Sequence, residues 1–229
     1  MRTTIKGTYS SLFFIGAILA TLSISTSGQA EEKKATTPTF AGLWNTSFGK
    51  LRLIEAGDGT IRGCYRWEGN NGEVAGKMEK GALAFSYTDV AKGEGRFELS
   101  EDGMSFSGKW RQEGTEKWNE WNGKRIIPIP GAKMLVVIEA RWESGLASEE
   151  FSFGEMLDSY FKRVPHIAVR ERFFTNYEGF AHWCRDIAYV AEPVVLSIAS
   201  HGTEKAITVN GKQISADQIA EALKYAANL

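Results

Sequence analysis

Cysteine is scarce in this chain of 229 residues, which contains only Cys64 and Cys184. The two lie far apart in the sequence and in different predicted domains, so a disulfide framework of the kind found in many small secreted domains is not what holds this protein together. We expect each cysteine to be a small buried hydrophobe rather than a reactive thiol.

The chain also has few histidines and almost no net charge. The chain has 27 basic and 28 acidic residues and a net charge of -1. It therefore lacks the basic surface that binds DNA or RNA, and no nucleic-acid partner is expected. The three histidines, His166, His182 and His201, are too dispersed to propose a metal site, and no cofactor is expected. A hydrophobic content of 43% is that of a globular protein with one large or two small domains.

The amino terminus lacks an apolar run long enough to predict a membrane span. Its apolar stretch, residues 12–22, follows Arg2 and Lys6 and leads to small residues that end at Ala30. This pattern predicts a secretory signal peptide at 1–30, with an uncleaved anchor as the alternative. No cysteine lies near the cleavage point, which argues against a lipid-anchored lipoprotein. We expect an exported protein, periplasmic or extracellular, that is not inserted in a membrane after cleavage.

Short alternating runs separated by glycine follow the polar linker 31–39 and fill residues 40–125. Apolar residues such as Leu51 and Leu53 alternate with charged ones, and glycine-rich turns separate the runs. This pattern predicts about eight strands in an all-β antiparallel meander or small barrel. The predicted strands are 44–48, 50–55, 60–67, 73–78, 82–88, 95–99, 105–110 and 117–123.

Glycine and aromatic motifs at 42–44, 63–65 and 106–110 resemble those of lipocalin-like and related bacterial barrels. Such barrels are filled by side chains or hold a ligand, and both alternatives stay open. This half of the chain has no histidine and its carboxylates are scattered, so we expect a binding or spacer module. Three tryptophans could either stack on a sugar or lipid or pack in the core and cover turns; they are Trp110, Trp118 and Trp121.

Two of the five prolines lie in the segment 126–132, which cannot run as a central strand or a helix. We place a domain boundary there. Beyond it, in 133–229, strand-length apolar runs alternate with helical patterns, which predicts an α/β domain with parallel strands. Asn210-Gly211 predicts a hairpin, and Ser215 with Gln218 predicts a capping box. The expected strands are 134–140, 166–172 and 194–199, and the expected helices are 152–164, 176–191 and one that begins at Ser215.

The apolar run that starts at Val194 ends in Ser200, His201 and Gly202, and we expect it to be a buried central strand. Ligands gather beyond the carboxyl ends of parallel strands, so His201 is a candidate general base. A histidine that only caps the strand is the alternative.

Arg141 and Trp142 follow the first strand of this domain, and we predict that they bind substrate at the same edge of the sheet. Arg141 would pair there with an acidic group; a solvated surface arginine is the alternative.

A strand that ends in Ser200-His201-Gly202, followed by a hairpin and a helix, resembles the histidine segment of the caspase-like cysteine peptidases, the clan of caspases, metacaspases and CHAT-type peptidases. The resemblance covers 133–229. It implies a doubly wound parallel sheet, a catalytic His201 with Gly202, and a peptide or protein substrate. In caspases the nucleophilic cysteine lies about 50 residues after the histidine. Here no cysteine follows His201, so the chain is either truncated before the nucleophile or a degenerate relative.

No other residue replaces the missing nucleophile. Cys184 and His182 are two positions apart on a predicted helix and cannot share a face. Ser200 and His201 are neighbours on a strand and point to opposite faces. The sequence therefore predicts an exported protein that carries part of a cysteine endopeptidase domain, caspase-like, incomplete and inactive.

A non-enzymatic exported protein, whose barrel binds a small apolar or sugar ligand, is the alternative function. In either case a missing fourth strand would leave a sheet edge unpaired, and such an edge predicts self-association.

Overall fold

The computed structural model describes residues 38–141 and 152–229, which belong to one compact unit. The predicted signal peptide, most of the linker 31–39 and Trp142 lie outside the described residues. Within the described ranges, no helix combines the length and the hydrophobicity needed to cross a bilayer.

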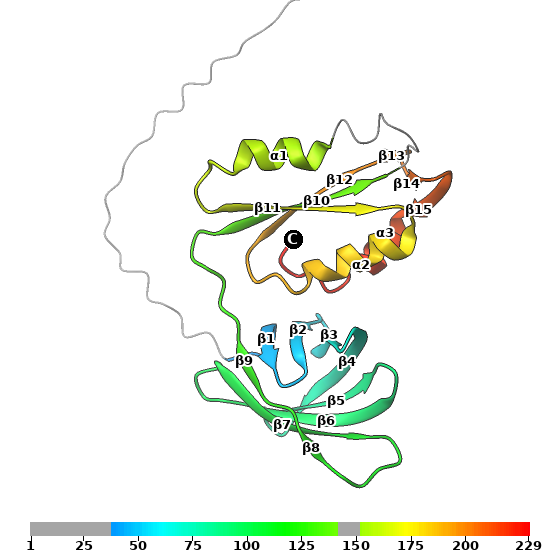
Figure 1. Cartoon of the computed structure of the whole chain (residues 1–229). Helices are drawn as coiled ribbons and strands as arrows, with labels where there is room; N and C mark the ends of the chain where they lie inside the picture. Colours follow the sequence, from blue (N-terminus) through cyan, green and yellow to red (C-terminus); the bar gives the residue numbers. More distant parts are fainter. Residues whose placement is uncertain (1–37, 142–151) are drawn as a thin grey trace, which may run out of the picture. The chain divides into compact units, whose positions relative to one another are not determined.

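The first nine strands form an antiparallel sheet that closes on itself (Figure 1). Each strand from β1 to β7 pairs with the next, and β9 pairs with both β1 and β7, while β8 lies against β7 alone. The predicted β-barrel is confirmed. Its strands are β1 (Gly42–Thr46), β2 (Gly49–Glu55), β3 (Thr60–Trp67), β4 (Asn70–Glu79), β5 (Ala82–Thr88), β6 (Lys92–Leu99), β7 (Ser105–Gln112), β8 (Asn119–Glu120) and β9 (Gly123–Arg125).

Aromatic and aliphatic side chains fill the barrel. Alternate residues of each strand point inward, and the ring of Phe97 lies 4.2 Å from that of Phe106 and 4.4 Å from that of Phe85. Gly95 makes room for this packing, since a Cβ there would lie 2.2 Å from Phe85. The buried cluster is Phe40, Trp44, Leu51, Leu53, Ile61, Tyr65, Val74, Leu83, Phe85, Tyr87, Phe97, Phe106 and Trp121.

The segment 117–123 was predicted as one strand and instead forms parts of two, β8 and β9. The strand is interrupted there because the side chain of Trp121 turns into the core, where only 2% of its surface is exposed. Its backbone N–H donates to the carbonyl of Gly108 at 2.9 Å, and its Nε1 donates to Thr46 Oγ1 at 3.0 Å. Burial of the indole thus outweighs strand continuity.

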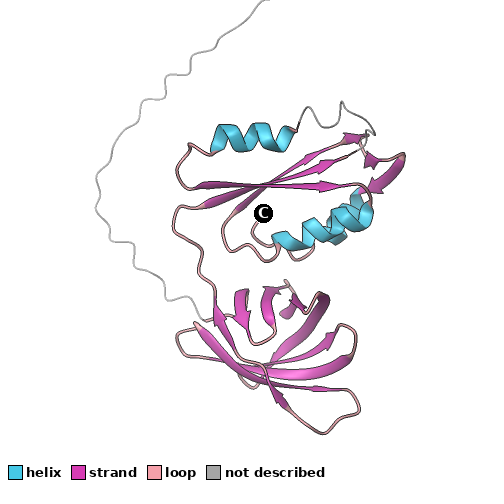
Figure 2. Ribbon diagram, in the orientation of Figure 1, coloured by secondary structure: helices cyan, strands magenta, loops and turns pink. Residues whose placement is uncertain are grey.

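Three parallel strands follow the proline-containing segment, in the order β11-β10-β12. Helix α1 covers one face of this sheet, and α2 and α3 lie on the other (Figures 1 and 2). A small antiparallel sheet, β13-β14-β15, follows β12. The bounds are β10 (Lys133–Ala140), α1 (Phe153–Phe161), β11 (Ile167–Phe174), α2 (Tyr177–Ile187), β12 (Val194–Ala199), β13 (His201–Gly202), β14 (Ala206–Val209), β15 (Lys212–Ser215) and α3 (Ala216–Leu223).

The predicted fold class, with its incomplete caspase-like α/β domain, is wrong. The described residues are mostly β, with a closed antiparallel barrel and three short helices, and the parallel sheet has only three strands. The Val194 run is an edge strand rather than a central one, because β10 pairs with strands on both of its sides. Only Val194 in β12 is buried, and Val195 is 61% exposed. A doubly wound caspase-like sheet is not formed by these residues.

Local signals in this half are borne out. The hairpin between β14 and β15 turns at Asn210 and Gly211, whose φ angles are 48° and 73°, as a two-residue turn of this kind requires. The Ser215 side chain accepts from the N–H of Gln218, and the Gln218 side chain accepts from the N–H of Ser215, so the predicted capping box is present.

Candidate functional site

His201 lies in β13 and pairs with Thr208 of β14, while the Ser200 hydroxyl donates to the Thr208 carbonyl at 2.7 Å. His201 and Gly202 are exposed. The strand therefore passes directly into the small antiparallel sheet instead of ending in a bare tip. Arg141 follows β10, and its guanidinium lies 3.9 Å from the centre of the Phe173 ring. Its predicted companion Trp142 is outside the described residues.

Neither cysteine is placed as a nucleophile. Cys184 is fully buried in α2, whereas His182 on the same helix is exposed, so the two do not face each other. Burial raises the pKa of Cys184 to about 12 and that of Cys64 to about 11. Both are protonated thiols at neutral pH, which is the unreactive form. Over the described ranges, histidine, cysteine and carboxylate side chains form no group suited to a metal ion.

A polar groove of about 650 Å³ lies at one rim of the barrel, and we call it the rim groove. Pairing across three strands creates it: Ser86 is opposite Glu94, and Glu94 is opposite Arg111. This size is within the roughly 300–1,000 Å³ typical of ligand sites. The rim groove is lined by Ser86, Tyr87, Thr88, Lys92, Gly93, Glu94, Arg111, Gln112, Glu113, Gly114 and Thr115.

Arg111 of the rim groove makes an ion pair and a cation–π contact. Its Nε donates to Glu94 Oε1 at 2.7 Å, and its Nη2 donates to the same oxygen. The guanidinium also lies over the ring of Trp118, 4.7 Å from its centre. Trp118 is 43% exposed. An exposed ring face, a fixed cation and a fixed carboxylate therefore stand side by side at the barrel rim.

Other aromatic residues at the same end of the barrel pack on one another. The Phe48 ring lies 5.4 Å from the rings of both Trp67 and Trp110, edge to face in each case. Trp110 also lies 5.6 Å from Tyr87, a residue of the rim groove. These ring contacts pack this end of the barrel, and Trp67 is 40% exposed.

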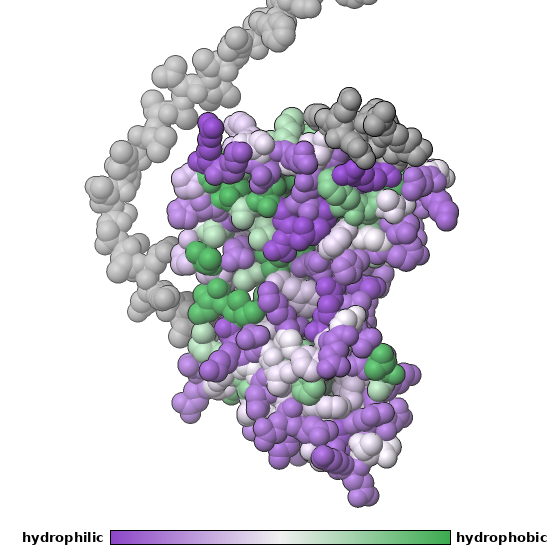
Figure 3. Space-filling model, in the orientation of Figure 1, coloured by the Kyte–Doolittle hydropathy of each residue, from purple (hydrophilic) through white to green (hydrophobic). Residues whose placement is uncertain are grey.

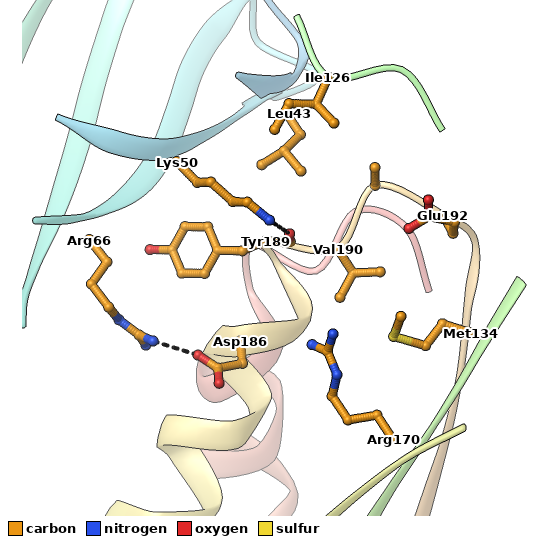
Figure 4. A pocket seen from close by; sticks show the side chains of 11 residues that line it. Leu43, Lys50, Arg66, Ile126, Met134, Arg170, Asp186, Tyr189, Val190 and Glu192 are labelled. Atoms are coloured by element: carbon orange, nitrogen blue, oxygen red, sulfur yellow. Dashed lines mark hydrogen bonds and ion pairs between the residues drawn. The ribbon is translucent and has the colours of Figure 1, made fainter. Parts of the chain in front are cut away.

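A second pocket, of about 480 Å³, lies where residues of β2 and β3 approach the end of α2 (Figure 4), and we call it the junction pocket. Arg66 Nη1 and Asp186 form an ion pair at 2.6 Å across it, and Lys50 Nζ donates to the Tyr189 carbonyl at 3.1 Å. Its lining is Leu43, Lys50, Arg66, Ile126, Met134, Arg170, Asp186, Tyr189, Val190, Ala191 and Glu192.

Arg52 closes the carboxyl end of α2 beside the junction pocket. Its Nε donates to the Ala188 carbonyl at 2.7 Å and its Nη2 to the Val190 carbonyl at 2.6 Å. The last carbonyls of a helix lack partners within the helix and carry partial negative charge, so cations are favourable there. Arg52 is 7% exposed, and this burial lowers its pKa from the ordinary value.

Sequence reasoning missed the residues of both pockets. Glu94 and Arg111 become neighbours only through the register of β6 and β7, and that register depends on turn lengths the residue pattern did not fix. Arg52 and Arg66 contact residues more than 100 positions away. Alternation on β2 and β3 marks them as outward-facing, but it does not show what covers them.

Comparison with known proteins adds no family to this picture. No protein-family model matches the sequence, and a search of curated proteins found no relative.

Proposed function

We propose that this chain is an exported, non-enzymatic binding protein whose rim groove recognises a sugar. The observation that carries the proposal is the Trp118–Arg111–Glu94 arrangement, in which an exposed ring adjoins an ion-paired cation and carboxylate. Export rests on the residue pattern of 1–30.

The chemistry of the rim groove suits sugar hydroxyl groups, each of which donates and accepts hydrogen bonds. Arg111 supplies donors, Glu94 supplies acceptors, and the hydroxyl groups of Thr88 and Thr115 supply both. The ring of Trp118 is 43% exposed, and the face that Arg111 does not cover offers a flat apolar surface to the C–H face of a sugar ring.

The interior of the barrel favours this surface site over an internal apolar ligand. Trp44, Leu51, Leu53, Leu83 and Phe97 are all fully buried there, and their side chains occupy the space that such a ligand would need. A barrel filled by its own side chains in this way holds no further apolar molecule without displacing its own rings.

A titration of soluble oligosaccharides of glucose, galactose and N-acetylglucosamine tests the proposal, with tryptophan fluorescence and calorimetry as readouts. We expect at least one sugar to bind, and Trp118→Ala to weaken that sugar about tenfold, since contact with apolar ring surface contributes about 25 cal/mol per Å² buried and about 1.4 kcal/mol is a tenfold change.

Trp67→Ala is the matched control, because Trp67 is exposed to a similar extent but its ring packs on Phe48, whereas the ring of Trp118 packs on Arg111 of the rim groove. The proposal fails if none of these sugars binds. It also fails if Trp67→Ala weakens binding as much as Trp118→Ala.

A further inference from the structure

The junction pocket joins cationic and apolar groups in one cavity. Lys50, Arg66 and Arg170 contribute three positive charges to its lining, and Asp186 and Glu192 contribute two negative ones. The apolar part of the lining is Leu43, Ile126, Met134, Val190 and Ala191. A ligand that fits both parts needs a negative group at one end and a hydrocarbon body.

Arg170, like Lys50, is a cation of this pocket that forms no ion pair among the described residues. It comes from β11, and its guanidinium points into the cavity (Figure 4). It forms no hydrogen bond or ion pair with any residue of 38–141 or 152–229. A guanidinium has five N–H donors in a planar fork that matches the two oxygens of a carboxylate.

Neighbouring donors can complete the site. The ammonium group of Lys50 has three N–H donors and donates one of them to the Tyr189 carbonyl, which leaves two for a ligand. Arg66 is paired with Asp186 through Nη1 and with Asn71 through Nε, and its Nη2 is buried without an acceptor among the described residues. Asp186 is thus neutralised by Arg66, and the remaining lining charges are those of Arg170, Lys50 and Glu192, which leaves a net positive charge to meet an incoming anion.

We propose that the junction pocket binds a small organic acid: a carboxylate held by Arg170 and Lys50, with an unbranched or aromatic apolar body against Met134 and Val190. This site is separate from the rim groove, and its ligand is chemically distinct from a sugar. Because Lys50 comes from the barrel and Arg170 from β11, the bound acid would contact both halves of the described chain.

Calorimetric titration of the full chain with octanoate tests the inference, with octanol as the uncharged probe of equal length. We expect octanol to bind at least tenfold more weakly than octanoate, and Arg170→Gln to weaken octanoate at least tenfold. Arg62→Gln is the matched control, an exposed barrel arginine outside the pocket, and should leave octanoate binding unchanged.

A measurement on the unaltered chain guards against a variant that misfolds. A carboxyl group with an ordinary pKa of about 4.3 loses its charge below that value, so octanoate binding should weaken about threefold between pH 6 and pH 4, while octanol binding should not depend on the ionisation of its ligand. Trp118→Ala should leave octanoate binding intact, which separates this site from the sugar site. Equal binding of octanol and octanoate, or octanoate binding that Arg170→Gln leaves unchanged, overturns the inference.

Discussion

The barrel and the three-stranded parallel sheet solve the problem of strand edges in opposite ways. In the barrel the ring of strands from β1 to β7 closes through β9, so each of these strands has a neighbour on both sides. In the parallel sheet β11 and β12 are both edges, and most of their residues are only half-buried. The strands of the barrel enclose their own hydrophobic core, whereas the parallel sheet buries its two faces only where helices pack against them.

The two regions also differ in the contacts that hold them: polar side chains anchor the ends of the helices, whereas aromatic rings hold the barrel core. In the parallel sheet, the buried Glu139 accepts from the N–H of Gly154 at 3.2 Å and from that of Phe153 at 3.3 Å, so a carboxylate of β10 caps the start of α1. At α2 the roles are reversed, because Arg52 of the barrel caps the end of a helix. The side chains of the barrel core, by contrast, are held mainly by ring-to-ring contact.

The visible face of the molecule is mostly hydrophilic, with scattered hydrophobic patches (Figure 3).

Truncation of a core ring should have the largest effect. Phe97 is fully buried and in contact with several rings, so Phe97→Ala should lower the free energy of unfolding by about 3–5 kcal/mol. Val195 on the edge strand β12 is 61% exposed, and Val195→Ala should change the free energy of unfolding by less than about 0.5 kcal/mol. Urea unfolding monitored by circular dichroism measures both. Similar losses for the two variants would contradict the contrast between closed core and open edge.

Removal of the Arg52 guanidinium should have the next largest effect. Arg52→Met leaves the Ala188 carbonyl without this donor, at a cost of about 1–3 kcal/mol, whereas the Val190 carbonyl still accepts from Asn228 Nδ2 at 3.1 Å. Amide hydrogen exchange should become faster at the carboxyl end of α2 and remain unchanged in β5 and β6.

Arg62→Met is the control for Arg52→Met, because Arg62 lies on the adjacent strand and is exposed. Equal exchange rates in α2 for the two variants would show that Arg52 does not support this helix end.

Alkaline pH should have the smallest effect. The pKa of Cys64 is raised from 9.0 to about 11 and that of Cys184 to about 12 by burial, so the folded state keeps both protons while the unfolded state loses them. Stability is therefore full below pH 9 and falls as the pH rises above it, by about 1 kcal/mol per pH unit for each thiol. Urea unfolding at pH 8, 9 and 10 measures the slope. A chain with both cysteines replaced by alanine should show a shallower slope, and an unchanged slope would disprove the thiol contribution.

Features with local causes could be predicted from the sequence. The alternation of Leu51 and Leu53, the turn at Asn210-Gly211 and the Ser215 cap each depend on residues a few positions apart, and all three are present. The order of strands could not be read in this way, because an apolar run such as 194–199 does not reveal whether it has one neighbour or two.

The candidate sites depend even more on contacts between distant residues. Arg111 meets Glu94 through strand pairing, and Arg170 reaches the junction pocket from a strand far from Lys50 in sequence. The sequence named Trp110, Trp118 and Trp121 as rings that could either stack on a sugar or lipid or pack in the core; Trp121 is buried in the core and Trp118 is exposed. The predicted peptidase residues His201 and Gly202 are exposed in β13, and membership of the caspase-like clan stays a prediction that no comparison tests.

The Arg52 contacts to α2 limit how this chain can be divided. A fragment cut in the proline-containing segment 126–132 would separate Arg52 and Lys50 from the carbonyls of Ala188, Tyr189 and Val190. The carboxyl-terminal piece would then expose the end of α2 without the Arg52 donors and an apolar surface around Tyr189, and the barrel would expose the guanidinium of Arg52, which the intact chain buries. We expect each half to be less soluble alone than together, so the two are poor candidates for exchange as independent modules.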